Sequence, residues 1–477
     1  MKILLVLPAI EKYRITAGSG KVPGRKMLRF SIMPLTAVAS LTPPEHPVAI
    51  CDENVQALDY DTDADLVGVS FMSALAPRAY EIAAEFRKRG KIVVAGGYHP
   101  TLCPDETSRH FDAVVAGDAE GLWPEVLRDA TEGRLKRIYR SDRFCDLSEA
   151  RVPRRDLMKE TSKHYATCYA VQTSRGCAHN CRYCSITAFH RGTFRTRPVE
   201  SVIGELKSIP RDFIFVDDNI IADADYAKKL FSAMAPLKKR WVGQCSLRIA
   251  DDPELLALAR RAGCHGLFIG IETANAKNLQ SVNKPVNLED SVESRVRKIR
   301  GAGIGIIAGI IVGMDFDDTT VFESTLAHLA TMEIDAVQVN IMTPLPGTPL
   351  HADMVRQGRI IDHDLANYDF RHVVFQPREM SPEQLQAGAD WLYRSFYRLD
   401  RILARSIKTV FTLGPAQAYL ALRLNLTYRY DNMREKIRGR NVALDRARGS
   451  GDFTPVIPDR SLFGREPVKI PDPGMNS

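Results

Sequence analysis

Short apolar runs alternate with amphipathic helical stretches through the first 140 residues. The runs are KILLVLP, PVAICDE, DLVGVSF, KIVVAGG and DAVVAGD. Between two of them, residues 76–89 place Ala79, Ile82, Ala83 and Phe86 at helical spacing. Continuous apolar strands that are separated by helices predict a parallel sheet with both faces covered. We therefore expect an α/β protein that begins with a five-stranded, doubly wound, Rossmann-like domain.

A second alternating series begins near Tyr169. Its runs are YAVQTSRG, DFIFVDD, WVGQCSL, GLFIGIE, GIIAGIIVG and AVQVNIM, with helical stretches such as residues 253–262 between them. Six strand–helix units predict a partial (β/α)6 TIM-type barrel, in which the chemistry lies at the carboxyl ends of the strands. After about residue 376 the pattern becomes helical, beginning at the capping serine Ser381. The expected parts are a doubly wound domain at 1–140, a linker at 141–168, the barrel at 169–375, and a helical extension with a frayed tail at 376–477.

Composition supports a folded chain rather than a disordered one. Of 477 residues, 45% are hydrophobic and 26% are charged, which suits two or three domains. The opening MKILLVLPAI lacks the cleavage site of a secretory signal, and no run approaches the ~20 apolar residues that cross a bilayer. We expect a cytoplasmic protein. The net charge of +7 is concentrated late, at 401–408 and 429–440, where basic runs usually form solvated helix faces.

Three of the nine cysteines crowd into the segment SRGCAHNCRYC, directly after the first barrel strand. Cys177, Cys181 and Cys184 follow a CxxxCxxC spacing, which favours metal ligation over disulfides. Thiolates bind both zinc and iron, and His179 or His190 could complete a zinc site. A four-iron cluster would instead leave one iron open, and S-adenosylmethionine (SAM) could chelate that iron and be cleaved reductively to a 5′-deoxyadenosyl radical.

Polar residues and glycines also follow the later barrel strands. Taken singly, such residues often cap helices or stiffen loops. They are Asp217, Asp218 and Asn219 after the second strand, Ser246 and Arg248 after the third, Gly270 and Glu272 after the fourth, and Asn340 with TPLPGTP after the sixth.

The cysteine segment and these strand ends together resemble the radical SAM superfamily. The resemblance implies a 4Fe-4S cluster on the three cysteines. It implies that Tyr183 and Asn340 lie beside the adenine of SAM. It also implies that Asp217, Asp218 and Asn219 contact the amino group of SAM, and that Ser246 and Arg248 contact its ribose and carboxylate. Gly270 and Glu272 would then lie against the ribose.

The carboxyl ends of the amino-terminal strands carry polar and glycine-rich clusters, and ligands of doubly wound sheets bind at such ends. The candidates are Asp52, Glu53, Ser70, Gly96, Gly97, Tyr98, His99, Gly117 and Glu120. Over residues 1–375 the domain order, with DLVGVSFMSALAPRAYEIA, VVAGGYHPTLCPDE and VVAGDAEGLWPEVL, resembles the cobalamin-binding radical SAM family, where these segments line the corrinoid site. The D-x-H-x-x-G loop that supplies a cobalt ligand is missing after the first strand. We therefore expect cobalamin to be bound without a protein imidazole.

This resemblance implies methylation of an unactivated carbon: the adenosyl radical removes hydrogen, and methylcobalamin delivers the methyl group. The similar proteins include hopanoid and bacteriochlorophyll methylases and the anaerobic ring cyclase of chlorophyll synthesis. Cobalamin-dependent cyclisation or rearrangement stays open, as does a non-catalytic corrinoid or iron–sulfur sensor. A tRNA methylthiotransferase would need a second cysteine triad. Expected partners are a lipid or tetrapyrrole-like small molecule and a donor such as flavodoxin or ferredoxin, with no nucleic acid and with a peripheral membrane contact left open.

Overall fold

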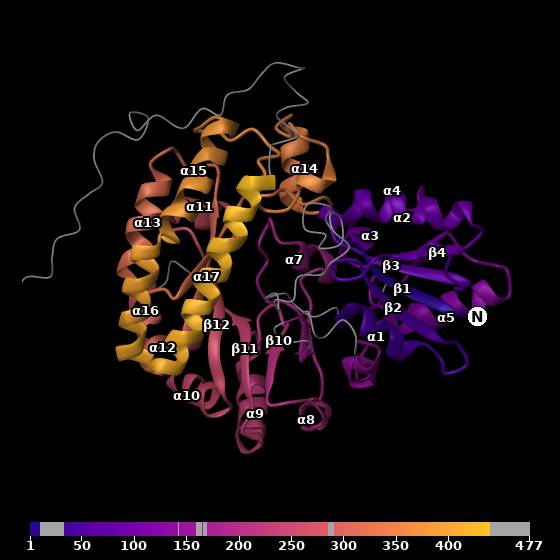
Figure 1. The fold of residues 1–477 in the computed structure, drawn as a ribbon, viewed down its shortest axis with the longest axis horizontal. Helices are drawn as coiled ribbons and strands as arrows, with labels where there is room; N and C mark the ends of the chain where they lie inside the picture. Colours follow the sequence, from indigo (N-terminus) through magenta and orange to yellow (C-terminus); the bar gives the residue numbers. More distant parts are fainter. Residues whose placement is uncertain (10–32, 142, 159–164, 166–168, 285–290, 439–477) are drawn as a thin grey trace, which may run out of the picture. The chain divides into compact units, whose positions relative to one another are not determined.

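The computed structural model describes residues 1–9, 33–141, 143–158, 165, 169–284 and 291–438, except for the side chains of residues 431–438. Within it, two parallel sheets and then a group of helices follow one another along the chain (Figure 1). Residues Met1–Met433 form one compact unit.

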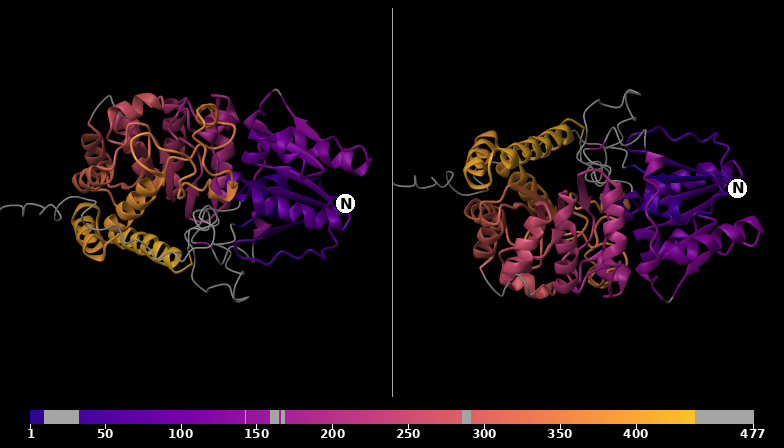
Figure 2. Two further views of the ribbon diagram at one scale, coloured as in Figure 1. Left: turned by 90° about the horizontal axis from the view of Figure 1, so that it is seen from above. Right: turned by 90° about the horizontal axis from the view of Figure 1, so that it is seen from below.

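The first sheet is parallel throughout, with its six strands in the order β2-β1-β3-β4-β5-β6. Alternate residues point to opposite faces, and both faces are apolar. Val67 and Val69 pack with Ile82 and Phe86 of α2, whereas Leu66 packs with residues of α1 and α5 on the other face. Figure 2 shows this indigo and violet sheet with helices on both of its sides. The elements are β1 (Ile3–Leu7), α1 (Met33–Leu41), β2 (Val48–Asp52), β3 (Leu66–Ser70), α2 (Ala76–Lys88), β4 (Ile92–Gly96), α3 (Tyr98–Leu102), α4 (Pro104–Thr107), β5 (Ala113–Ala116), α5 (Ala119–Thr131) and β6 (Ile138–Arg140).

The doubly wound prediction is confirmed, but the expected strand number was one too low. The edge strand β6 pairs with β5 through Val114–Ala116 and was missed because it has only three residues, one of them the exposed Arg140.

The second sheet has the strand order β14-β13-β12-β11-β10-β7, so each new strand is added beside the previous one. This is the expected partial barrel. Its elements are β7 (Ala170–Val171), β8 (Ser174–Gly176), α7 (Ser185–His190), β9 (Phe194–Thr196), α8 (Val199–Ser208), β10 (Asp212–Phe215), α9 (Ala224–Met234), β11 (Arg240–Cys245), α10 (Pro253–Arg261), β12 (Cys264–Glu272), α11 (Ala276–Ser281), α12 (Val292–Gly301), β13 (Gly305–Val312), α13 (Val321–Thr331), β14 (Ala336–Ile341) and α14 (Pro349–Arg356).

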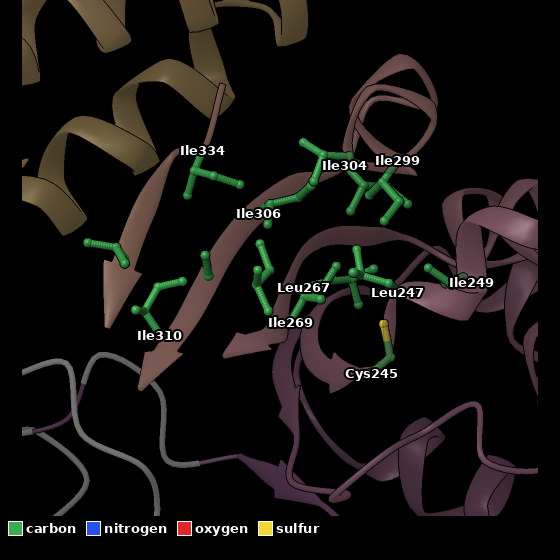
Figure 3. Packing of buried hydrophobic residues seen from close by; sticks show 14 of the residues in the cluster. Cys245, Leu247, Ile249, Leu267, Ile269, Ile299, Ile304, Ile306, Ile310 and Ile334 are labelled. Atoms are coloured by element: carbon green, nitrogen blue, oxygen red, sulfur yellow. The ribbon is translucent and has the colours of Figure 1, made fainter. Parts of the chain in front are cut away.

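An apolar layer fixes the barrel strands against their helices. Leu267 and Ile269 of β12 and Ile306 of β13 are fully buried, and they meet Ile299 of α12 in the same cluster (Figure 3). The strands therefore hold their carboxyl ends, where the predicted site residues lie, in fixed register.

The last described helices are α15 (Pro382–Phe396), α16 (Leu399–Leu413) and α17 (Pro415–Arg438). A capping box starts α15: the Ser381 hydroxyl accepts from the Gln384 N–H, and the Gln384 side chain accepts from Ser381 N–H. The buried Tyr397 then donates to the Val337 carbonyl at 2.6 Å, which ties these helices to β14. A helical extension is thus present up to residue 438, whereas the expected frayed tail lies outside the described residues. In the described part of the chain, no helix combines the length and apolarity needed to traverse a bilayer.

Candidate active site

The three clustered cysteines lie in the loop between β8 and α7. Burial raises the pKa of the Cys181 thiol to about 12, and it also raises the pKa values of Cys177 and Cys184. Bound metal would favour the thiolates instead. Among the described residues these three sulfurs do not all come within 4.8 Å of one another. Three thiolates can hold either a zinc ion or an iron–sulfur cluster.

Asp217 anchors the strand that leads into this loop. One carboxylate oxygen accepts four hydrogen bonds, from the N–H and hydroxyl groups of Thr173 and Ser174, at 2.5–2.9 Å. The other oxygen is buried without a hydrogen-bond partner in the described structure. The resemblance suggested that Asp217 contacts the SAM amino group, but this carboxylate is turned toward β7 and β8.

Asp218 and Asn219, the two residues after Asp217, lie near other parts of the predicted site. Burial together with Asp217 raises the pKa of Asp218 to about 7, and the charge of Asp218 in turn contributes to the raised pKa values of Cys177 and Cys184. Asn219 accepts from the Ser246 N–H at 3.1 Å, which joins the ends of β10 and β11. Of the predicted acidic group, Asp218 is therefore the member that faces the cysteine loop.

A second group of contacts holds the loop from its other side. The Arg182 N–H donates to the Val282 carbonyl at 3.3 Å, and the Asn283 side chain donates to the Asn180 carbonyl at 2.9 Å. Asn283 has the left-handed conformation, with φ of 58°. The Arg182 carbonyl in turn accepts from Leu350 N–H at 3.1 Å. The loop is thus fixed between the turn after α11 and the start of α14.

Glu272, at the end of β12, is the centre of the predicted SAM site. It has a left-handed backbone, with φ of 68°, at a register shift between β12 and β13. The ammonium group of Lys284 donates to its carboxylate and to the Gly270 carbonyl, and the side chains of this ion pair are only 12% and 10% exposed. Tyr183 lies beside the same carboxylate: burial and then the negative charge of Glu272 raise the pKa of the Tyr183 hydroxyl. A Cβ at Gly270 would lie 2.3 Å from a Glu272 carboxylate oxygen and 2.9 Å from the Lys284 ammonium group, so a side chain there would displace this ion pair.

The structure therefore brings together Tyr183, Gly270 and Glu272, as expected, and adds Lys284. No motif pointed to Lys284, which lies twelve positions beyond Glu272 in a turn of unremarkable sequence.

The remaining predicted SAM contacts stay at the expected strand ends. Ser246 precedes the short 3-10 helix Leu247–Asp251, in which Arg248 is exposed. Asn340 accepts from the Gln338 side chain at 3.3 Å. Their contacts with SAM remain predictions.

Several side chains that were predicted to contact cobalamin bond other residues of the protein. Asp52, fully buried, accepts from Asn54 and from the Tyr165 hydroxyl. Glu53, 2% exposed, pairs with Arg78 at 2.5 Å. Both carboxylates point inward, so they shape the strand end rather than offering free oxygens to a ligand.

Both ring nitrogens of His99 also lie within a hydrogen-bond network of protein side chains. One ring nitrogen lies 3.0 Å from the Ser73 hydroxyl, and the other lies 3.1 Å from both Glu106 and the Tyr80 hydroxyl. The imidazole is 1% exposed. Neither nitrogen is available as a cobalt ligand, and the network instead fixes the start of α3.

At these strand ends, free space lies beside glycine backbone rather than beside polar side chains. A Cβ built on Gly96 or Gly117 would meet nothing within 4 Å. Gly97 differs: its φ is 103°, and a Cβ would lie 2.9 Å from the Phe71 backbone. Ser70 is half-buried beside it. A cavity of about 160 Å³ adjoins Gly117, and it is also lined by Thr101, Arg143 and Phe189; the Tyr98 ring lies 4.9 Å from that of Phe189.

An ion-pair network joins the end of β5 to the cysteine segment. Arg175 bonds Asp118 at 3.0 Å and Glu120 at 2.5 Å, and Arg195 bonds Asp118 at 2.7 Å. The Cys145 thiol lies 3.3 Å from Asp118, and burial raises its pKa to about 12. Because two guanidinium groups already neutralise these carboxylates, we assign the group to structure rather than to metal binding. Glu120 is therefore another predicted cobalamin contact that is used internally.

Two family models match the chain. Residues 171–329 match the radical SAM superfamily, and residues 41–127 match the B12 binding domain. The first range contains the cysteine loop and Glu272, and the second contains the open glycines of the amino-terminal sheet.

Characterised relatives are similar over most of their length. A bacteriochlorophyllide d C-12(1)-methyltransferase of Chlorobaculum tepidum is 30% identical over 382 residues, which cover 78% of this chain and 83% of that protein. The hopanoid C-2 methylase of Rhodopseudomonas palustris is 29% identical, with coverages of 70% and 67%. Among solved structures, the radical SAM methyltransferase TsrM of Kitasatospora setae, with tryptophan and a SAM analogue bound, has a TM-score of 0.65 at 16% identity, over 92% of this chain and 99% of that one. The last likeness establishes a shared fold.

Proposed function

Because the chain belongs to the cobalamin-dependent radical SAM methyltransferases, we propose that it methylates an unactivated carbon of a tetrapyrrole or a polycyclic lipid. The family's cofactors are a 4Fe-4S cluster, SAM and cobalamin. When bound, they supply the electron that cleaves SAM, the radical that removes a hydrogen atom, and the methyl group that replaces it.

The observation that carries this proposal is the meeting of Tyr183, Glu272 and Lys284 beside the cysteine loop. Cys177, Cys181 and Cys184 would hold the cluster as thiolates. Glu272 would accept hydrogen bonds from the ribose hydroxyls of SAM, because Lys284 fixes the position of its carboxylate. Such charge-assisted bonds contribute about 1.5–3 kcal/mol each.

In the amino-terminal domain, the open backbone at Gly96 and Gly117 would allow close approach of cobalamin. We propose Ser70 and Tyr98 as the side chains nearest to it. The relatives named for tetrapyrroles and hopanoids support a small, largely apolar substrate, and flavodoxin or ferredoxin is the proposed electron donor.

The test is anaerobic turnover with SAM that carries a trideuterated methyl group. Protein reconstituted with iron, sulfide and hydroxocobalamin is reduced and supplied with a bacteriochlorophyllide or a hopanoid. Methylation predicts 5′-deoxyadenosine together with a product that carries the labelled methyl group. Deoxyadenosine with an unlabelled, altered product would indicate cyclisation or rearrangement, and no deoxyadenosine would favour a sensor.

A further inference from the structure

The outward face of α16 is apolar. Leu403, Ile407 and Phe411 are 56%, 60% and 84% exposed, and their spacing of four residues places them on one side of the helix. Ile402 and Thr409, on the opposite side, are buried against the protein. The helix therefore contacts the protein through the side that carries Ile402 and Thr409. No residue that the structure describes covers the opposite, apolar side.

The next helix continues this surface. Tyr419, Leu420, Leu426 and Tyr430 of α17 are exposed, whereas Asn425 is buried. Asn425 accepts from Arg405 of α16 at 2.7 Å and donates to the Asp335 carbonyl at 2.8 Å. Figure 1 shows α16 and α17 as neighbouring helices. Polar contacts on the inner side therefore hold the pair to the barrel, and the apolar side chains are left outside.

The charges around this surface are mainly positive. Residues 399–430 contain five basic residues and one acidic residue, Asp400, which pairs with Arg398 at 3.1 Å. Arg401 and the exposed Lys408 follow the apolar positions of α16 around the helix, and Lys408 also pairs with Glu333 at 2.6 Å. On α17, Arg423 is exposed and lies over the Tyr419 ring at 5.8 Å. Tyrosine and arginine are typical of the boundary between lipid headgroups and acyl chains.

We propose that this hairpin face, formed by Leu403, Ile407, Phe411, Tyr419 and Leu426, docks on an anionic lipid bilayer. Apolar side chains flanked by basic ones bind such surfaces through burial of apolar area and attraction to acidic headgroups. The same charges oppose pairing with a second copy of the chain, because two faces with an excess of positive charge would repel each other. The inference does not depend on which molecule is methylated.

Flotation of the full-length holoprotein with lipid vesicles tests the proposal. We expect binding to vesicles of equimolar phosphatidylcholine and phosphatidylglycerol, and weak binding to phosphatidylcholine alone. The double variant Ile407→Ser/Phe411→Ser should bind roughly tenfold more weakly or worse, since two large apolar groups no longer insert. Arg401→Gln/Arg423→Gln should weaken binding to the anionic vesicles and reduce its sensitivity to salt.

The matched control is Val355→Ser, which removes an equally exposed apolar side chain (53%) from α14 and should bind as the unaltered protein does. Circular dichroism and iron content verify that each variant is folded. Two results would overturn the proposal: absence of binding by the unaltered protein, and equal binding by the Ile407/Phe411 variant.

Discussion

The ammonium group of Lys284 bonds the carboxylate of Glu272 at the point where the backbone of Glu272 is left-handed. A non-glycine residue holds this conformation only where its surroundings fix it. The ion pair, the register shift beside it and the close approach of Gly270 supply that constraint. The carboxylate is thereby placed before any ligand arrives.

The first prediction compares the effects of replacing Glu272 and of replacing Lys284. Glu272→Gln should weaken SAM binding roughly 10- to 150-fold, because a charge-assisted bond of about 1.5–3 kcal/mol is lost. Lys284→Met should lower the free energy of unfolding by about 3–5 kcal/mol, because a buried carboxylate loses its partner, and Glu272→Gln should also lower it, because the ammonium group stays buried without a counter-charge. The double variant should regain part of this stability but not the SAM affinity. Equilibrium dialysis and chemical denaturation measure both, with iron content as the control. An unchanged SAM dissociation constant for Glu272→Gln would contradict the placement.

The second prediction concerns the cluster. Replacing Cys177, Cys181 or Cys184 by Ala should lower bound iron after anaerobic reconstitution and abolish formation of 5′-deoxyadenosine. Cys245→Ala is the matched control, since this buried thiol belongs to the apolar core of the barrel and should leave iron content unchanged. Full SAM cleavage by Cys181→Ala would refute the assignment.

The third prediction uses two adjacent glycines that differ in their surroundings. Gly96→Leu adds a side chain into open space, so the fold should persist while uptake of hydroxocobalamin is lost. Gly97→Leu forces a Cβ against the Phe71 backbone at a φ of 103°, so it should destabilise the domain itself. Visible spectra, bound cobalt and thermal unfolding distinguish the two. Gly204→Leu, at an open position on α8, controls for the substitution. Normal cobalt uptake by Gly96→Leu would show that the corrinoid does not bind beside Gly96.

The fourth prediction concerns pH. Burial lowers the pKa of His190 from 6.5 to about 4, and Arg195 contributes in the same direction. Between these values the unfolded chain holds a proton that the folded protein does not, so stability is complete above pH 6.5 and is lost as the pH falls toward 4. The loss amounts to about 3 kcal/mol. Urea unfolding of the apoprotein at several pH values should show this slope, and His190→Gln should flatten it. An identical slope in the variant would assign the effect to other groups.

The strands and the cluster loop could be predicted because their signals are local. Apolar runs such as DLVGVSF and GIIAGIIVG coincide with β3 and β13, and the cysteine spacing marks its own loop. Glu272 could be placed for the same reason, since it directly follows a strand.

The partners of polar side chains could not be predicted, because they come from distant parts of the chain. Asp52 is bonded by Tyr165, 113 positions away, and Glu120 by Arg175, 55 positions away. The sequence shows a carboxylate at a strand end, and only the fold shows whether another residue already occupies it. The same holds for Lys284, whose role depends on a turn that follows a separate helix.

The bonds of Arg175 to Asp118 and Glu120 limit how freely the two α/β halves can be exchanged among related enzymes. Arg175 lies two residues before Cys177, so the segment that carries the cluster is held partly by acidic residues of the other half. A chimera with a foreign amino-terminal half would inherit a buried guanidinium without its partners, unless acidic residues were grafted at the positions of 118 and 120. Inheritance of the two halves as a matched pair is the expected evolutionary outcome.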